Sequence, residues 1–362
     1  MLWSELTVAI GDVLESGQFI LGSRVEEFER QFSVYCGAVH GIGVSSGTEA
    51  LRLAMQACGV GPGDEVLTVS HTCVPTVAAI TSLGAVPVCV DIETDTYTID
   101  PSQLEARVTT KTKAIVPVHL YGQCADMDPI LTFAREYGLR VIEDCAQAHG
   151  ARDAGRVAGT MGDAGCYSFY PTKNLGAVGD AGMVVTNDGA IAERVKWLRN
   201  YGQTDRAHHE LKGDNGRLDE LQAAVLSVKL GYLERWTARR RAIAQAYAAG
   251  LVETPIGCPT EAVNRFHVYH LYVVRVSDRG AFQEALARQG IETLVHYPVP
   301  VHRQPAYSEL LRDDHALEVT NRMASEIVSL PMYPELEDSE VEQIITAVQE
   351  WAASIRDAWR VT

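Results

Sequence analysis

A lysine set among small residues is the strongest chemical candidate in the sequence. Lys173 lies in CYSFYPTKNLGAVGDAGMVVT, after a β-branched run and a proline and before several glycines. A lysine on a tight loop at a strand end is placed to form an imine with an aldehyde, if burial lowers its pKa enough to leave some free amine. In the same segment, the hydroxyl of Ser168 could contact a phosphate. Taken alone, a lysine in this setting is more typical of a surface turn.

A carboxylate stands where another β-branched run gives way to a loop. Asp144 lies in VIEDCAQAHG, and its burial would be costly without a cationic partner. A protonated pyridine nitrogen is one such partner, and the ion pair keeps the ring electron-withdrawing. An aspartate that caps the next helix is at least as common an interpretation of this motif.

Small residues mark a possible phosphate site at the start of a helix. In SSGTEAL, Ser46, Gly47 and Thr48 lead from a strand directly into a helix, whose free N–H groups could bind a phosphate. An ordinary N-cap has the same residues. Further along, GDNGRLDELQAA places Asn215 before another helix and by itself indicates only a helix start.

The remaining histidines do not predict a metal site. His208 and His209 are adjacent, and His267 and His270 are three residues apart, without a third ligand at a suitable spacing. In a strand-like run, residues at i and i+3 point to opposite faces. We therefore expect no bound metal.

The elements that must position these residues alternate between strands and helices. Helical patterns such as TEALRLAMQACG and ADMDPILTFAREYG end in glycine and separate short β-branched runs. This alternation predicts an α/β fold with a large, mostly parallel sheet, in which ligands gather at the carboxyl ends of the strands. The predicted strands are 41–46, 65–70, 86–92, 113–120, 140–146, 166–170 and 183–186.

The second part of the chain predicts a smaller domain. A helix is expected over 218–236, and Thr237–Arg241 is interpreted as a solvated helix face. A strand over 267–276 and a helix over 281–290 then begin a new α+β unit. We expect a large domain over 1–240, which opens with an amphipathic N-terminal helix, and a small C-terminal domain over 241–362.

Composition excludes several partners. The chain has 362 residues and a formal net charge of −16, which disfavours nucleic acid and anionic membranes as partners. No apolar stretch approaches the roughly 18 residues that span a bilayer. The cysteines never form a CxxC pair, and several lie in apolar runs, so we expect reduced thiols and a cytoplasmic location. An anionic substrate would then need local positive charge in its site.

Several motifs together resemble one enzyme family over nearly the whole chain. The series SSGTEAL, SHTCVPTVAAI, EDCAQAHGA, SFYPTKNLGAVGDAGM, NGRLDELQAA and HYPVPVHRQPAY is similar to the DegT/DnrJ/EryC1/StrS aminotransferases. The resemblance implies a fold-type I transferase that uses pyridoxal 5'-phosphate. It implies that Lys173 binds the cofactor covalently and moves the reacting proton, that Asp144 pairs with the pyridine nitrogen, and that Gln147 lies against the ring.

The resemblance also implies the contacts of the cofactor phosphate. Gly47, Thr48 and Ser168 would hold it, with Ser46 beside them. Asn215 would reach the phosphate from the neighbouring subunit, so a homodimer is expected to share its active sites.

One position departs from the family pattern. Cys73 stands where an aromatic residue usually stacks on the pyridine ring. A cysteine offers less contact area, so either the cofactor binds more weakly or His71 shares the role.

Within the family, the motifs look most like the branch that aminates C3 of dTDP-linked 3-keto-6-deoxy sugars. The resemblance implies L-glutamate as amino donor and makes Tyr170, His296 and Tyr297 candidates for contacting sugar or diphosphate. Packing at a domain seam is the alternative for the last two. Other readings are a keto-cyclitol aminotransferase of the scyllo-inosose type, another nucleotide sugar as substrate, or a non-catalytic regulatory protein. A deoxysugar dehydratase is disfavoured because those relatives replace the lysine with histidine.

Overall fold

A large sheet organises the first half of the protein. The computed structural model describes residues 2–308 and 316–361, with side chains to residue 355. In these ranges, seven strands form the main sheet, in the order β1-β9-β8-β5-β4-β2-β3. Only β9 runs antiparallel to its neighbours, while the other adjacent pairs are parallel. The strands are β1 (His40–Val44), β2 (Glu65–Val69), β3 (Val86–Val90), β4 (Thr112–Ile115), β5 (Arg140–Asp144), β8 (Ala164–Ser168) and β9 (Gly182–Thr186).

The predicted strands coincide with these seven, which confirms the α/β class. The largest difference is the run expected over 113–120, which is a strand only to Ile115. Beyond that point a 3-10 turn, Leu120–Gly122, begins.

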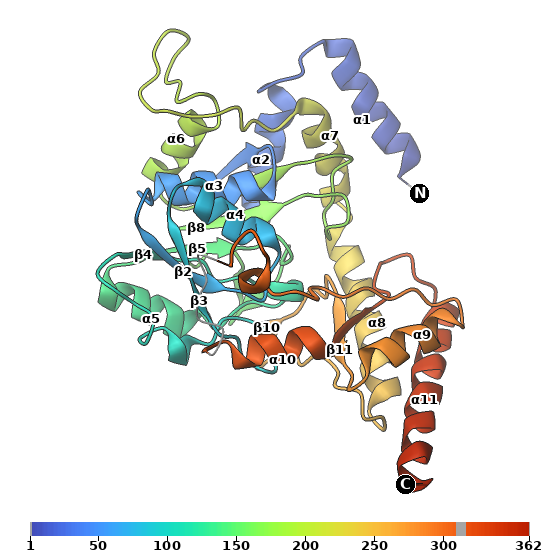
Figure 1. Cartoon of the computed structure of the whole chain (residues 1–362). Helices are drawn as coiled ribbons and strands as arrows, with labels where there is room; N and C mark the ends of the chain where they lie inside the picture. Colours follow the sequence, from blue (N-terminus) through green and yellow to red (C-terminus); the bar gives the residue numbers. More distant parts are fainter. Residues whose placement is uncertain (1, 309–315, 362) are drawn as a thin grey trace.

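Helices cover both faces of the sheet because successive side chains of a strand point to opposite faces. In β9, Val184 packs in the core beneath α3, whereas Met183 and Val185 pack in the core beneath α2. Figure 1 shows α3 and α4 close to the sheet and α1 extending from the body beside α7. The helices of this part are α1 (Trp3–Ser16), α2 (Ser23–Cys36), α3 (Gly47–Ala57), α4 (Val74–Ser82), α5 (Met127–Tyr137), α6 (Gly189–Leu198) and α7 (Glu220–Leu230).

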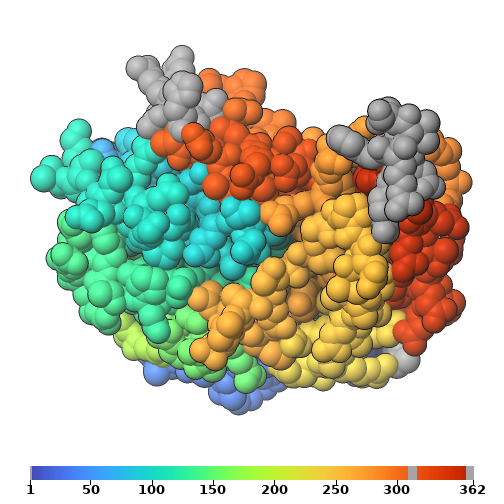
Figure 2. Space-filling model, turned by 90° about the horizontal axis from the view of Figure 1, so that it is seen from below, coloured from blue at the N-terminus to red at the C-terminus, as the bar shows by residue number. Residues whose placement is uncertain are grey.

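The C-terminal part has a core of its own, built around the antiparallel pair β11 and β12. In Figure 2 this part, in gold to red, packs against the cyan and green segments of the sheet region. The boundary expected at residue 240 falls inside α8. The elements are α8 (Leu233–Leu251), β10 (Arg265–Phe266), β11 (Tyr272–Arg275), α9 (Arg279–Ala287), α10 (Glu318–Glu326), β12 (Ile327–Leu330) and α11 (Asp338–Val361).

Two local predictions are wrong in this part. The helix expected over 218–236 is broken between α7 and α8, and the strand expected over 267–276 is confined to β11. Ahead of it, the short β10 pairs with β6 (Arg152–Asp153), itself paired with β7 (Arg156–Val157).

The interpretation of residues 237–241 as a solvated face is also wrong. Thr237 and Arg240 are buried. Arg239 and Arg241 pair instead with Asp338 and Glu261. The face of α8 that carries Thr237 and Arg240 packs inward, because residues at i and i+3 share one face of a helix. No helix in the described ranges has both the length and the apolar character needed to cross a bilayer.

Candidate active site

The predicted lysine and aspartate come from neighbouring parallel strands. β5 ends at Asp144, which lies in register with Cys166 of β8, and the loop after β8 carries Lys173. A turn in which the Lys173 N–H donates to the Tyr170 carbonyl at 2.8 Å shapes this loop. The carboxyl ends of parallel strands meet at one sheet edge, so both side chains belong to one site.

Asp144 is a buried carboxylate whose environment suits a cationic ring. Its side chain is 4% exposed, and burial raises its pKa, although hydrogen bonds and the Lys173 charge oppose the rise. Thr76 Oγ1 donates to Oδ2 at 2.8 Å, and the Ala146 N–H donates to Oδ1 at 3.1 Å. Among the described residues, no lysine, arginine or histidine nitrogen lies within ion-pair distance of Asp144. A pyridinium nitrogen would supply the missing cation, so the cofactor fits here.

Lys173 is a partly buried amine. Desolvation lowers its pKa, and the charges of Asp144 and Cys73 oppose the shift. A lowered pKa leaves more of the free amine that imine formation requires. Lys173 also lines a cavity of about 810 Å³ between its loop and the C-terminal part. The lining of this cavity includes His296 but not Asp144, Gln147 or the residues expected to bind the phosphate.

The expected phosphate contacts lie together at the start of α3. Ser46 is the N-cap of this helix and its Oγ accepts from the Glu49 N–H at 3.1 Å. Gly47 packs so closely on Ser168 that a Cβ at residue 47 would lie 2.5 Å from the Ser168 Cβ. Because the first N–H groups of a helix have no intrahelical partner, Gly47 and Thr48 present donors at this point. The site therefore fits a phosphate group.

The residues expected around the ring form one hydrogen-bonded group. Gln147 is buried, accepts from the Tyr121 N–H at 2.7 Å and donates to the Tyr297 hydroxyl at 3.1 Å. Burial and the neighbouring Cys73 thiol raise the pKa of Tyr297. His71 Nε2 lies 2.8 Å from the hydroxyl of Tyr121, the same tyrosine whose N–H binds Gln147. Cys73 and His71 thus both border this group, Cys73 beside Tyr297 and His71 against Tyr121.

The candidates for contacting the substrate do not all lie in the cavity. His296 lines the cavity and its Nδ1 lies 2.8 Å from Ser329 Oγ. Burial and the Lys173 charge lower the His296 pKa. Tyr170 is 52% exposed and does not line the cavity.

Asn215, the residue expected to reach the phosphate of a neighbouring subunit, is exposed. The next residue, Gly216, accepts from the Ser45 N–H at 3.0 Å.

Three residues at this site were missed by sequence reasoning. They are Thr76, whose hydroxyl binds Asp144, and Arg240 and His270, which line the cavity. Thr76 lies one helical turn after Cys73 within a motif of the resemblance, so that motif carried a signal for it. Nothing local distinguishes Arg240 from its two arginine neighbours.

A buried cluster elsewhere has the composition of a metal site but is already satisfied. His119, Glu143 and Cys145 present ligand atoms within 4.8 Å of one another. His119 Nδ1 accepts from the Ala125 N–H at 3.0 Å, so Nε2 carries the proton and donates to Glu143 Oε2 at 2.8 Å. The Glu143 carboxylate also accepts the backbone N–H groups of residues 159, 161 and 162. These hydrogen bonds satisfy the buried polar groups of His119 and Glu143.

The fold and this site define an aminotransferase built on a mostly parallel sheet. Residues 3–349 match the DegT/DnrJ/EryC1/StrS aminotransferase family, and the chain belongs to that family. The predicted enzyme class, fold class and pyridoxal phosphate cofactor are thereby confirmed.

Close relatives extend over almost the full length. A dTDP-3-amino-3,6-dideoxy-alpha-D-galactopyranose transaminase of Aneurinibacillus thermoaerophilus is 49% identical, covering 96% of this chain and 95% of the relative. A dTDP-3-amino-3,4,6-trideoxy-alpha-D-glucose transaminase of Streptomyces venezuelae is 45% identical, with 99% and 94% coverage. The crystal structure of S. venezuelae DesV in complex with ketimine intermediate superposes with a TM-score of 0.95 at 46% identity, covering 97% of this chain and 95% of DesV.

Proposed function

We propose that this enzyme transfers an amino group from L-glutamate to C3 of a dTDP-linked 3-keto-6-deoxyhexose. The observation that carries the proposal is the placement of Lys173, with a lowered pKa, and buried Asp144 in one site beside a cavity. Relatives at 45% and 49% identity that are named as transaminases of dTDP-3-amino sugars support the substrate class.

Each side chain of the site has a different role in such a transfer. Pyridoxal phosphate, when bound, supplies an electron-withdrawing ring and an aldehyde carbon that exchanges amino groups. Asp144 holds the proton on the ring nitrogen, and Thr76 orients this carboxylate. Lys173 Nζ takes up and returns the reacting proton as the base in both half-reactions.

Cofactor anchoring depends on polar groups from several elements. Ser46, Gly47, Thr48 and Ser168 bind the phosphate at the start of α3. Gln147 and Cys73 lie against the ring, and Gln147 is held there by its hydrogen bond to the Tyr297 hydroxyl.

The remaining assignments concern the substrate, the assembly and the location. His296 and Tyr297 contact the sugar, and exposed Tyr170 contacts its diphosphate. Asn215 of each subunit completes the phosphate site of the other in a homodimer. Free cysteines, six of which are buried, support a reducing cytoplasm as the location.

A two-step spectral titration tests the proposal. L-glutamate should convert the absorbance of the bound aldehyde cofactor to that of its amine form, and a dTDP-3-keto-6-deoxyhexose should restore it. A cofactor that responds to glutamate but not to this sugar would contradict the substrate assignment. The same titration with a UDP-linked keto sugar and with scyllo-inosose then identifies the acceptor.

A further inference from the structure

The cavity beside Lys173 has a cationic end. Lys229 and Arg240 line it next to Trp236, and burial lowers the pKa of both cations, that of Arg240 to about 10. Lys229 Nζ donates to the Gly176 carbonyl at 2.6 Å, within the Lys173 loop. These two cations give this end of the cavity local positive charge, and Glu335 lies near both of them.

Arg240 differs from the arginines on either side of it in α8. Arg239 binds Asp338 at 2.6 Å, and Arg241 binds Glu261 at 2.6 Å. Arg240 is 6% exposed and, among the described residues, lies within ion-pair distance of no carboxylate. A buried guanidinium without a paired carboxylate is unusual because its burial carries a large desolvation cost.

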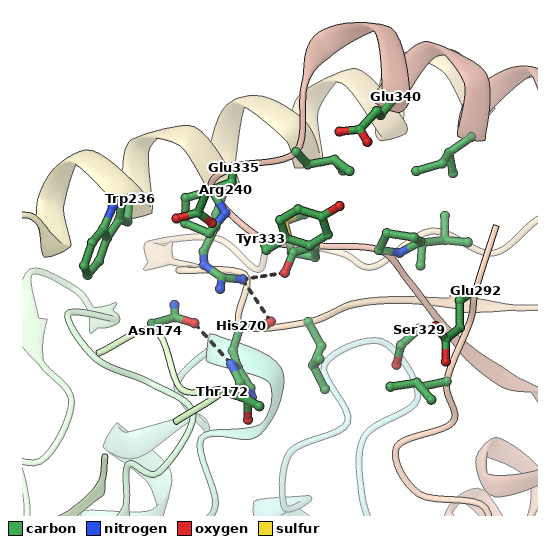
Figure 3. A pocket seen from close by; sticks show the side chains of 18 of the residues that line it. Thr172, Asn174, Trp236, Arg240, His270, Glu292, Ser329, Tyr333, Glu335 and Glu340 are labelled. Atoms are coloured by element: carbon green, nitrogen blue, oxygen red, sulfur yellow. Dashed lines mark hydrogen bonds between the residues drawn. The ribbon is translucent and has the colours of Figure 1, made fainter. Parts of the chain in front are cut away.

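The hydrogen bonds of Arg240 leave one edge of its guanidinium without a partner. Its Nη1 binds three carbonyl oxygens, of Tyr269 at 3.1 Å, His270 at 3.2 Å and Met332 at 2.9 Å. Nε is buried without a hydrogen-bond partner, and Nη2 donates to none of the described groups. Nε and Nη2 form the planar edge that binds both oxygens of a carboxylate. Figure 3 shows Arg240 above His270 and to one side of Trp236, with dashed lines for those of its hydrogen bonds whose acceptor residues are drawn.

The neighbours of this edge connect it to the reacting lysine. Asn174, which follows Lys173, donates to the Val268 carbonyl at 3.2 Å, so its Oδ1 accepts from His270 Nδ1 at 3.1 Å. This arrangement leaves His270 Nε2 without the proton. Burial and the charges of Lys173 and Arg240 hold the His270 pKa well below its usual value, so the imidazole adds no positive charge.

We propose that the open edge of Arg240 binds a carboxylate of the amino donor. The proposal rests on the function above and adds the site that recognises glutamate. The amine and the α-carboxylate of glutamate share one carbon, so a carboxylate held in the Lys173 cavity keeps its amine near the reacting centre. In a 3-keto sugar nucleotide, by contrast, ring atoms separate the diphosphate from the reacting carbon. Glu292, Glu335 and Glu340 also line the cavity, and the charge of Glu335 opposes the lowering of the Arg240 pKa by burial without forming an ion pair with it.

Binding experiments on the holoenzyme test this site. We would compare Arg240→Gln, Arg240→Lys and the neighbouring control Arg241→Gln. Glutamate is titrated spectrally without any sugar, and 2-oxoglutarate binding to the amine form of the holoenzyme is measured by calorimetry. Loss of a charge-assisted hydrogen-bond pair should weaken both affinities roughly tenfold to a hundredfold in Arg240→Gln. The affinities of Arg240→Lys for both ligands should lie between those of Arg240→Gln and the wild type. Those of Arg241→Gln should stay within about twofold of the wild type.

A carboxylate-free amine separates recognition from a purely structural role. Butylamine should convert the cofactor equally slowly in wild type and Arg240→Gln, because it makes no use of the guanidinium. Equal losses for butylamine and glutamate would overturn the proposal, as would an unchanged glutamate affinity. A loss confined to the KM of the sugar nucleotide would overturn it in favour of the diphosphate. If Arg240→Gln does not fold by circular dichroism, Arg240→Lys provides the same comparison. Normal glutamate recognition without amination of any sugar would instead contradict only the proposed function.

Discussion

Thr76 Oγ1 donates a 2.8 Å hydrogen bond to Asp144 Oδ2, joining the first turn of α4 to the end of β5. The Thr76 hydroxyl also lies 2.9 Å from Thr72 Oγ1. The hydrogen bond from Thr76 to Asp144 opposes the effect of burial and lowers the pKa of Asp144. It therefore favours the ionised carboxylate that a pyridinium needs.

Replacing Thr76 by valine should weaken cofactor binding. Removal of the donor raises the pKa of Asp144 further and loses a hydrogen bond to a charged group, worth about 1.5–3 kcal/mol. The dissociation constant for pyridoxal phosphate, measured by fluorescence titration, should rise roughly tenfold or more. Thr76→Ser keeps the hydroxyl and should bind normally. Equal affinities for the two variants would contradict the role of Thr76.

Lys173→Ala should abolish turnover because the only proposed base and imine-forming amine is removed. The variant should still bind the cofactor through Asp144 and the phosphate site. Lys173→Arg is the matched control, since it keeps a positive charge but forms no imine. Steady-state assays with glutamate and keto sugar provide the measurement, and appreciable transamination by either variant would refute the assignment.

The pH dependence of Lys173 should respond to Asp144. Desolvation lowers the pKa of this amine and the Asp144 charge raises it. In the cofactor-free protein, the reaction of Lys173 with an amine-specific reagent should therefore rise with pH through a midpoint below 10.5. Asp144→Asn removes the raising effect and should move this midpoint to lower pH. A midpoint that stays in place or moves upward would show that the two groups do not interact as described.

Buried neutral histidines should make the protein sensitive to acid. Burial lowers the pKa of His71 to about 4 and those of His149 and His267 to about 3. Because these values lie below 6.5, the unfolded state binds the extra protons. The stability that these neutral histidines contribute is present above pH 6.5 and is lost as the pH falls below that value. Between pH 7.5 and 5.5, each of the three histidines should lower the free energy of unfolding by about 1.4 kcal/mol.

Urea unfolding at these two pH values measures the effect. His149 packs on the rings of Tyr167 and Phe169, with centroids 5.4 and 5.6 Å away. His149→Phe should therefore be tolerated and should reduce the pH dependence by the amount given for one group. A pH dependence that stays the same in His149→Phe would contradict the effect described for His149.

Glu220 should be important for stability because it caps a distant helix. Its buried carboxylate accepts the backbone N–H groups of Gly22 at 2.8 Å, Arg24 at 3.0 Å and Val25 at 2.9 Å. Glu220→Gln replaces one acceptor oxygen by a donor and should cost about 2–3 kcal/mol of unfolding free energy. Half-exposed Glu27→Gln in the capped helix α2 should leave the thermal midpoint almost unchanged. Similar midpoints for the two variants would contradict the capping role.

The sequence by itself determined the strand and helix alternation and the place of Asp144 and Lys173 at strand ends. These features follow from local periodicity and from small residues at turns, which act within a few positions of the chain. Neighbouring parallel strands then bring the two side chains to one edge of the sheet.

Only the tertiary structure decided which distant side chains complete the site. Thr76 meets Asp144 across 68 positions, and Gln147 meets Tyr297 across 150. Arg240 has the same local pattern as its arginine neighbours, yet α8 packs so that it alone of the three faces the cavity. Such contacts depend on which helix face is buried and against which element, and this choice is made by long-range packing rather than by local propensity.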